Sequence, residues 1–239
     1  MKYKNIIKAK FVDRPNRFIS NVLIDGRKEV VHVKNTGRCK ELLKPNATVF
    51  LSRGDSSTRK TKYDLISVVK EKNGGNKILI NIDSQIVNDV AEEWILNSGY
   101  FSSITKYKRE VTFEESRFDF YIEQGEEKIF LEVKGVTLEN DGIASFPDAP
   151  TLRGIKHINE LCKCIDEGYR AIILFIVQMK GVTFFTPNKE IHKDFSDALT
   201  NAKNYGVEIL CIDCNITENS IEYDTFIPVL LDWWFLNSF

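Results

Sequence analysis

The first third of the chain consists of short runs in which apolar and β-branched residues alternate with polar ones. Turn signals such as Asp25-Gly26 and Asn73-Gly74-Gly75 separate these runs. An alternation of period two, interrupted by turns at short intervals, is typical of a small all-β domain. The runs predict strands at Ile6–Val12, Phe18–Ile24, Glu29–Val33, Thr48–Leu51, Asp64–Val69 and Ile78–Ile82. Five or six strands of this length indicate a small, closed or partly closed barrel of the OB type.

From residue 84 onward the apolar residues recur at helical spacing instead. Val87, Val90 and Trp94 lie on one face of a predicted helix over 84–97, and Ser98-Gly99 supplies a stop signal. The stretch Leu138–Pro150 is polar, contains two prolines and predicts a loop. The other predicted elements are strands at Tyr107–Phe113, Arg117–Glu123, Lys128–Val136, Tyr169–Val177 and Val207–Ile212, and helices at Thr151–Glu167 and Asp194–Asn204.

The order of these elements predicts a mixed α+β protein with two domains. Residues 1–83 would form the OB-like barrel, and residues 84–239 an α/β domain in which helices cover a mixed sheet. At 239 residues and 43% hydrophobic composition, the chain is long enough to bury two cores.

Composition also narrows the cellular setting. No run reaches about 18 uncharged apolar residues, and Met1–Asn5 lacks the apolar segment of a signal peptide. Five sparse cysteines argue against a disulfide framework. We therefore expect a cytoplasmic protein that does not meet a membrane. The apolar tail, with Trp233 and Trp234, favours either core packing or a dimer contact, so a homodimer stays open.

Charge is divided unequally along the chain. Residues 1–80 hold 19 Lys and Arg against 7 Asp and Glu, whereas residues 81–239 hold 14 against 27. Such asymmetry suggests that the first part meets a polyanion, and carbohydrate binding by the barrel is the weaker alternative. Basic residues in and beside the turns suit a groove that follows the phosphate backbone of DNA, duplex or single-stranded. The candidates are Arg17, Arg38, Arg53, Arg59, Lys60 and Lys62.

Three charged residues interrupt two otherwise apolar strands of the second domain. Because successive side chains of a strand point to opposite faces, Glu132 and Lys134 project together, and Asp119 lies on the neighbouring strand. Burying charges is costly unless a metal or a counter-charge compensates them. Two carboxylates suit Mg²⁺, which usually takes only one or two from the protein, and Mn²⁺ could replace it. Lys134 would hold the attacking water or stabilise the transition state. The alternative is a structural ion-pair cluster.

Longer motifs give the sequence a family resemblance. The order of helix, strand with Asp119, hairpin and Glu132-x-Lys134 resembles the PD-(D/E)xK nuclease superfamily. Nearly the whole chain resembles the sugar fermentation stimulation protein A family, through Pro15-Asn16-Arg17-Phe18, Asn35-Thr36-Gly37-Arg38, Ser98-Gly99-Tyr100, Ser116-Arg117-Phe118-Asp119-Phe120, Leu131-Glu132-Val133-Lys134-Gly135-Val136-Thr137-Leu138 and Phe146-Pro147-Asp148-Ala149-Pro150-Thr151-Leu152-Arg153-Gly154-Ile155-Lys156-His157.

The resemblance implies an OB-like domain, a PD-(D/E)xK restriction-endonuclease-like domain, DNA binding and a role in regulating sugar utilisation. Its nuclease-like residues map onto Glu93, Asp119, Glu132 and Lys134, and Phe118 stands where the superfamily name has proline. These four would form a site for Mg²⁺-dependent phosphodiester cleavage. A fold of this kind can also be retained for binding alone, which leaves a non-catalytic DNA-binding regulator as the alternative.

The predicted helix that begins at Thr151 carries three further candidates. Arg153 and Lys156 could meet a phosphate near the metal, although a solvated face is equally open for Lys156. For His157 we expect the commoner fate of a half-buried structural histidine.

Overall fold

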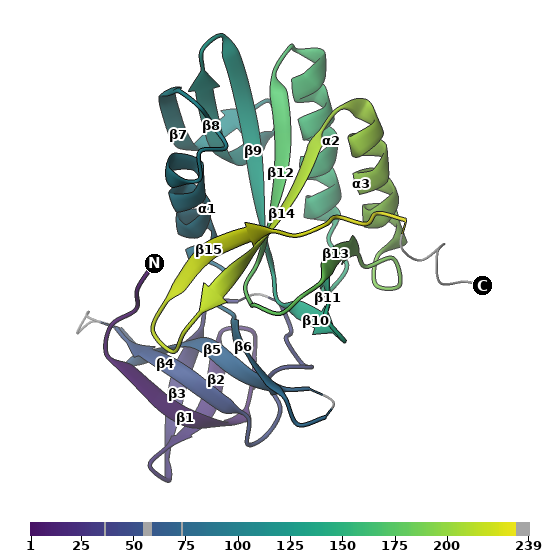
Figure 1. The fold of residues 1–239 in the computed structure, drawn as a ribbon. Helices are drawn as coiled ribbons and strands as arrows, with labels where there is room; N and C mark the ends of the chain where they lie inside the picture. Colours follow the sequence, from purple (N-terminus) through teal and green to yellow (C-terminus); the bar gives the residue numbers. More distant parts are fainter. Residues whose placement is uncertain (36, 55–58, 73, 233–239) are drawn as a thin grey trace.

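The computed structural model describes residues 1–35, 37–54, 59–72 and 74–232. It contains a barrel domain and, next to it, a larger domain in which helices pack on both faces of a sheet (Figure 1). Trp233 and Trp234, for which we predicted core packing or a dimer contact, lie outside the described residues. In the described part of the chain, no helix is both long and apolar enough to cross a membrane.

The strands of the barrel domain form one sheet that closes into a ring. Neighbouring strands pair in the order β3-β2-β1-β4-β5-β6, and a parallel pairing of β3 with β5 closes a ring of the first five. The inward positions, such as Val22, Val49 and Leu65, are fully buried. This confirms the predicted OB-like barrel. The strands are β1 (Ile6–Asp13), β2 (Ile19–Ile24), β3 (Arg27–Val33), β4 (Thr48–Arg53), β5 (Tyr63–Glu71) and β6 (Lys77–Asn81).

The second domain is built on a six-stranded mixed sheet in the order β15-β14-β12-β9-β8-β7. Strand β12 pairs in parallel with both β9 and β14, and the other pairs are antiparallel. This confirms the mixed sheet that the element order predicted. Its strands are β7 (Ile104–Phe113), β8 (Ser116–Gln124), β9 (Glu127–Val136), β12 (Arg170–Val177), β14 (Glu208–Ile216) and β15 (Ile221–Phe226).

Three helices cover the two faces of this sheet. On one face α1 (Ile86–Asn97) packs Val90 and Trp94 against Leu131 and Val133. On the other face lie α2 (Leu152–Asp166) and α3 (Lys193–Tyr205) (Figure 1). Because β12 is covered on both sides, its residues alternate between the two cores, which explains its uninterrupted apolar sequence.

The stretch Leu138–Pro150 is not simply a loop, and that prediction was wrong in part. It contains the hairpin of β10 (Leu138–Asn140) and β11 (Ile143–Phe146), and β11 also pairs in parallel with β13 (Phe184–Pro187). The turn between β10 and β11 is Asp141-Gly142, with both residues at positive φ. The partner strand β13 comes from a distant part of the sequence, so local pattern could not reveal the sheet.

The two domains are joined by more than the chain between β6 and α1. Gln178, after β12, donates its side-chain amide to the Asn81 side chain and to the Asp83 carbonyl, both at 3.0 Å. The side chain of Glu139 on β10 is fully buried. Its carboxylate forms ion pairs with two lysines of the barrel, Lys70 at 2.6 Å and Lys72 at 2.8 Å. The interface therefore contains buried polar contacts whose partners come from both domains.

Candidate functional site

The candidate site begins where β8 and β9 separate. The ladder between these strands ends at the pair Phe120 and Leu131, and beyond it the Asp119 carboxylate accepts the backbone N–H of Val133 at 2.8 Å. The side-chain amide of Asn88, in the first turn of α1, donates to the other oxygen at 2.7 Å. The side chain of Asp119 thus replaces a strand partner and is held in one orientation.

Glu132 lies next to it, almost completely buried at 3% exposure. Its Oε1 atom accepts from the Lys134 ammonium at 2.5 Å and contacts Nδ1 of His157 on α2. Its Oε2 atom is buried and has no hydrogen-bond partner among the residues that the structure describes. A buried carboxylate oxygen without a partner is costly, so this atom is suited to contact a ligand.

His157 is a hydrogen-bonded histidine, as expected, but it is fully buried rather than half-buried. The ring is buried, and Arg153 donates its Nε–H to the Nε2 atom at 3.3 Å. Because arginine can only donate, the neutral ring must carry its proton on Nδ1, from where it is donated to Glu132. Arg153, at the protein surface, is therefore connected through His157 to Glu132. Sequence spacing gave no indication of this link.

The two carboxyl groups differ in their electrostatics. Burial and the negative charge of Glu132 raise the pKa of Asp119 to about 6. Burial alone would also raise the pKa of Glu132, but the hydrogen bond from His157 and the charge of Lys134 outweigh it and leave that pKa below its usual range. The site therefore holds one ionised carboxylate and a second that resists ionisation beside it.

These residues fit a divalent cation. A cation would be a partner for the Oε2 atom of Glu132 and would oppose the burial and repulsion that together raise the pKa of Asp119. Within the described residues no group of three or more His, Cys, Asp or Glu side chains converges on one point. Two carboxylates are enough for Mg²⁺, which keeps several waters and takes substrate oxygens.

The structure does not bring Glu93 into this cluster. Its carboxylate lies 3.4 Å from the N-terminal amine of Met1 instead. At 3.6 residues per turn, Glu93 lies about 140° around the helix from Asn88, which is the α1 residue that contacts Asp119. Asn88 escaped the sequence analysis because an amide at a helix start has no distinguishing pattern.

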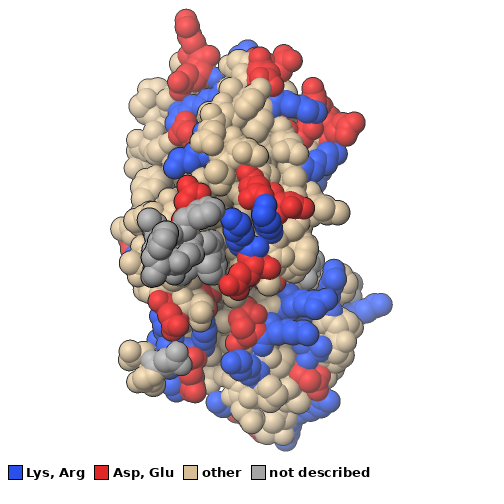
Figure 2. Space-filling view, turned by 90° about the vertical axis from the view of Figure 1, so that its right-hand side faces the viewer, with Lys and Arg blue, Asp and Glu red and all other residues tan. Residues whose placement is uncertain are grey.

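The basic residues predicted to contact nucleic acid separate into groups. Lys and Arg gather over the barrel domain in the lower part of Figure 2, whereas both signs mix above it. Arg53, Lys60 and Lys62 are exposed beside the β4–β5 connection. Arg59 instead uses its guanidinium on Asp64, which is 4% exposed. This ion pair leaves Arg59 less able to meet a phosphate.

The two basic residues of α2 also differ. Lys156 donates to the Glu115 carbonyl at 3.1 Å and lies 3.4 Å from its carboxylate, so its ammonium faces the β7–β8 turn. Arg153 keeps its terminal amino groups free of any partner in the described part of the chain. Of the two, Arg153 is therefore the one whose side chain has hydrogen-bond donors left for a ligand.

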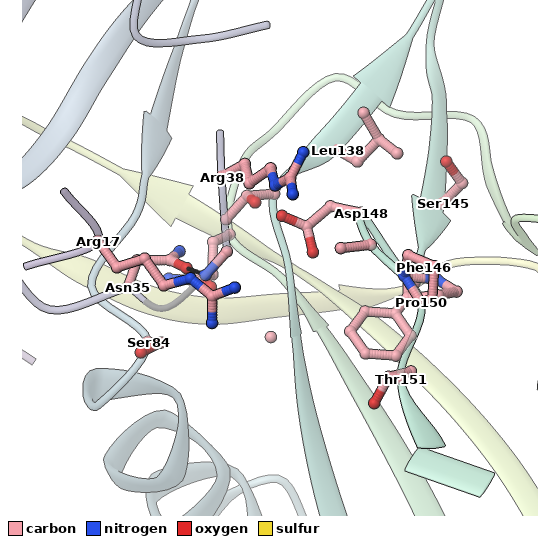
Figure 3. A pocket seen from close by; sticks show the side chains of 16 residues that line it. Arg17, Asn35, Arg38, Ser84, Leu138, Ser145, Phe146, Asp148, Pro150 and Thr151 are labelled. Atoms are coloured by element: carbon pink, nitrogen blue, oxygen red, sulfur yellow. Dashed lines mark hydrogen bonds between the residues drawn. The ribbon is translucent and has the colours of Figure 1, made fainter. Parts of the chain in front are cut away.

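A cavity of about 460 Å³ lies between the domains, close to the carboxylate cluster. The barrel contributes Arg17, Asn35 and Arg38, and the second domain contributes Asp148 and Thr151, among others. Figure 3 shows Arg17 and Arg38 extending toward the space that Asp148 enters from the other domain. Gly135, directly after Lys134 on β9, also lines the cavity. The cavity is thus adjacent to the strand that carries Glu132.

Comparison with known proteins agrees with this architecture. The family profile "SfsA N-terminal OB domain" matches residues 12–82, and "Sugar fermentation stimulation protein RE domain" matches residues 85–220. A "Sugar fermentation stimulation protein homolog" of Clostridium beijerinckii is 55% identical over 97% of this chain and 100% of its own length. A homolog of the same name from Desulfitobacterium hafniense is also 55% identical, over 97% of this chain and 99% of its own.

A solved structure is similar over almost the whole molecule. It is described as Pyrococcus furiosus SfsA in complex with Ca²⁺, is 30% identical, covers 96% of this chain and 98% of its own, and superposes with a TM-score of 0.85. The agreement extends across both domains and their order. The OB domain precedes the RE domain in the sequence, and the chain therefore belongs to the sugar fermentation stimulation protein family.

Proposed function

We propose that this protein binds DNA and hydrolyses its phosphodiester bonds with the help of a divalent cation held by Asp119 and Glu132. The observation that carries the proposal is the buried, unpartnered Oε2 atom of Glu132 beside a carboxyl group whose pKa is raised to about 6. A cation bound between the two side chains would give Oε2 a partner and would favour the ionised form of Asp119. The Pyrococcus furiosus relative is described as a complex with Ca²⁺, and this supports the binding of a divalent cation by the present protein.

Each residue of the cluster has a role in this proposal. A bound Mg²⁺ or Mn²⁺ would lower the pKa of a water and neutralise charge that develops on the phosphate. Asn88 and His157 fix the orientation of the two carboxylates. Lys134, 2.5 Å from Glu132 and largely buried, is a fixed cation that stabilises the negative transition state.

Binding of DNA is supported by the charge of the barrel. Residues 1–80 carry 19 Lys and Arg against 7 Asp and Glu, and Arg53, Lys60 and Lys62 are exposed. Electrostatic binding of this kind makes the logarithm of the affinity fall with the logarithm of salt concentration, by about 0.9 per phosphate contact on duplex DNA. Affinity that does not change with salt would exclude the barrel as the docking surface.

Cleavage is tested with labelled duplex and single-stranded DNA in Mg²⁺ or Mn²⁺. Wild type should give products, Glu132→Gln should give none, and Glu126→Gln should behave as wild type because Glu126 is exposed on the β8–β9 hairpin. Calorimetry with Ca²⁺ should show binding to wild type and Glu126→Gln only. Equal products from Glu132→Gln would point to a contaminating nuclease.

The second candidate is a DNA-binding regulator of sugar utilisation that keeps the fold without cleaving. It is favoured by the partners of the buried Glu132 charge, because Lys134 and His157 already contact its Oε1 atom without a cation. This function predicts salt-dependent DNA binding that is unchanged in Glu132→Gln, and no products with either metal.

A further inference from the structure

Two arginines line one wall of the interdomain cavity without acidic partners. Arg17 and Arg38 come from separate loops of the barrel, and neither guanidinium pairs with a carboxylate within residues 1–35, 37–54, 59–72 and 74–232. Figure 3 shows both side chains extending toward the same space. Like charges that face one cavity repel each other unless an anion lies between them, and guanidinium groups match phosphate geometry well.

A third arginine builds this wall. Arg14 donates to the carbonyls of Arg17, Asn35, Gly37 and Arg38 at distances of 2.6 to 2.8 Å. Its charge is therefore used to hold the backbone on either side of the two cavity arginines. Their placement is set before a ligand arrives, which lowers the entropic cost of binding.

The starts of two helices also border the cavity. Ser84, two residues before α1, lines the cavity, and so does Thr151, whose hydroxyl caps α2 by accepting from Gly154 at 3.0 Å. The N-terminal end of a helix carries a partial positive charge. The two helix starts therefore add to the positive potential of the two arginines.

Asp148 limits which anion fits. Its side chain contributes the only carboxylate among the described lining residues, and no ion pair joins it to Arg17 or Arg38. A carboxylate accepts hydrogen bonds from hydroxyl or amino groups and repels a bare anion. The volume of about 460 Å³ is in the usual range for small-molecule sites. The two arginines and Asp148 together therefore favour a phosphate that is attached to a group with several hydrogen-bond donors.

We propose that this cavity binds a phosphorylated sugar, as a single nucleotide of a nucleic-acid strand presents it. Arg17 and Arg38 contact the phosphate, and Asp148 accepts from a hydroxyl or a base amine. The proposal rests on the proposed function only in taking nucleic acid, rather than a free sugar phosphate, as the source.

Two neighbouring features favour a strand as that source. A second hollow of about 420 Å³ on the barrel contains Lys40 and shares Arg17, Gly37 and Arg38 with the cavity, so a basic path leads into it. At the far side, Gly135 is three residues from Glu132, about 10 Å along β9. A nucleotide in the cavity would thus belong to a strand that passes the carboxylates.

The test is calorimetric titration of the full chain in buffer that contains EDTA. The probes are a 5′-phosphorylated trinucleotide, a nucleoside monophosphate, glucose 6-phosphate and inorganic phosphate. The two nucleotides should bind most tightly, and the double variant Arg17→Ala, Arg38→Ala should bind them at least about tenfold more weakly. Arg27→Ala removes an exposed arginine of β3 that does not line the cavity and should bind as wild type.

A second variant tests the contact with the sugar or base. Asp148→Asn should weaken nucleotide binding and leave inorganic phosphate binding equal or stronger. Thermal unfolding verifies that every variant is folded. Nucleotide binding that is absent from wild type, or unaffected by the double variant, would overturn the proposal. Tighter binding of glucose 6-phosphate than of nucleotides would overturn nucleic acid as the source. Because no metal is present, these results are independent of whether Glu132 supports cleavage.

Discussion

Glu132 and His157 contact each other in the protein interior, although they are 25 positions apart in the sequence. The carboxylate belongs to β9 and the ring to α2, and both are almost inaccessible to solvent. A helix on one face of the sheet therefore decides how a carboxylate of the sheet is oriented. The Arg153 guanidinium in turn holds the ring from the surface side.

Replacement of His157 should affect cation binding in a graded manner. His157→Ala removes the group that orients Glu132, and we expect it to weaken Mn²⁺ or Ca²⁺ binding about 10- to 100-fold, as is typical of residues behind a metal ligand. His157→Asn keeps a donor near the position of Nδ1 and should lose less. Calorimetric titration measures both. Equal affinities for wild type and His157→Ala would mean that Glu132 needs no support from α2.

The raised pKa of Asp119 predicts a stability cost at neutral pH. The folded protein binds this proton more tightly than the unfolded chain, whose value is near 3.8. The carboxyl group therefore stabilises the fold at pH values below the unfolded pKa, and the contribution is lost as pH rises through about 6. Asp119→Asn should be more stable than wild type at pH 8, by about 3 kcal/mol at most, and equal to it near pH 3.5.

Urea unfolding at the two pH values measures this difference. Saturating Ca²⁺ at pH 8 should stabilise wild type and leave Asp119→Asn unchanged, because the variant lacks the ionised ligand. A variant that is less stable than wild type at pH 8 would show that the bonds from Val133 and Asn88 outweigh the burial penalty.

The ion cluster between the domains should be sensitive to charge removal. Burial alone would raise the pKa of Glu139, but Lys70 and Lys72 outweigh it and hold that pKa below its usual range. The stability that the Glu139 carboxylate contributes is therefore fully present above the usual pKa of a glutamate. It is lost as the pH falls through the lowered pKa of Glu139. Glu139→Gln leaves two partly buried ammonium groups without their partner and should cost about 1–3 kcal/mol of unfolding free energy at pH 7. Urea unfolding is the measurement, with exposed Glu126→Gln as the control.

Arg59 and Lys60 should give opposite results although they are adjacent. Lys60→Ala should reduce the salt slope of duplex DNA binding by about 0.9 if this residue meets a phosphate. Arg59→Ala should instead lower stability by about 1–3 kcal/mol, since it removes the guanidinium from the nearly buried Asp64. Fluorescence anisotropy at several salt concentrations and urea unfolding separate the two effects. A reduced slope with unchanged stability in Arg59→Ala would contradict the structural role.

Periodicity was enough to predict much of the fold. The alternation around Glu132 and Lys134 correctly placed both on one face of β9, and α2 begins at Thr151, its cap, where a helix was predicted to begin. These features depend on residues a few positions apart, where backbone geometry decides direction. The closed barrel was also predictable, because each of its strands has its own local pattern.

Other features depend on distant partners and could not be predicted. The contact of His157 with Glu132 depends on how α2 lies across the sheet, and Asn88 rather than Glu93 reaches Asp119 because of the rotation of α1. Arg59 was grouped with the exposed basic residues because its pairing with Asp64 requires the folded β4–β5 region. Charge and spacing identify candidates, whereas tertiary contacts decide which of them remain available.

The first residues of the chain have a consequence for any attempt to separate the domains. Met1 accepts a hydrogen bond from Ile221 at 3.0 Å, and Tyr3 donates to Asn219 at 2.8 Å, so this segment pairs with the β14–β15 hairpin of the second domain. Tyr3 also accepts from Asn81 at the end of the barrel. A fragment that starts at residue 84 would leave that hairpin with an uncovered edge. The second domain expressed alone would therefore lack the backbone partners that residues 1–3 supply.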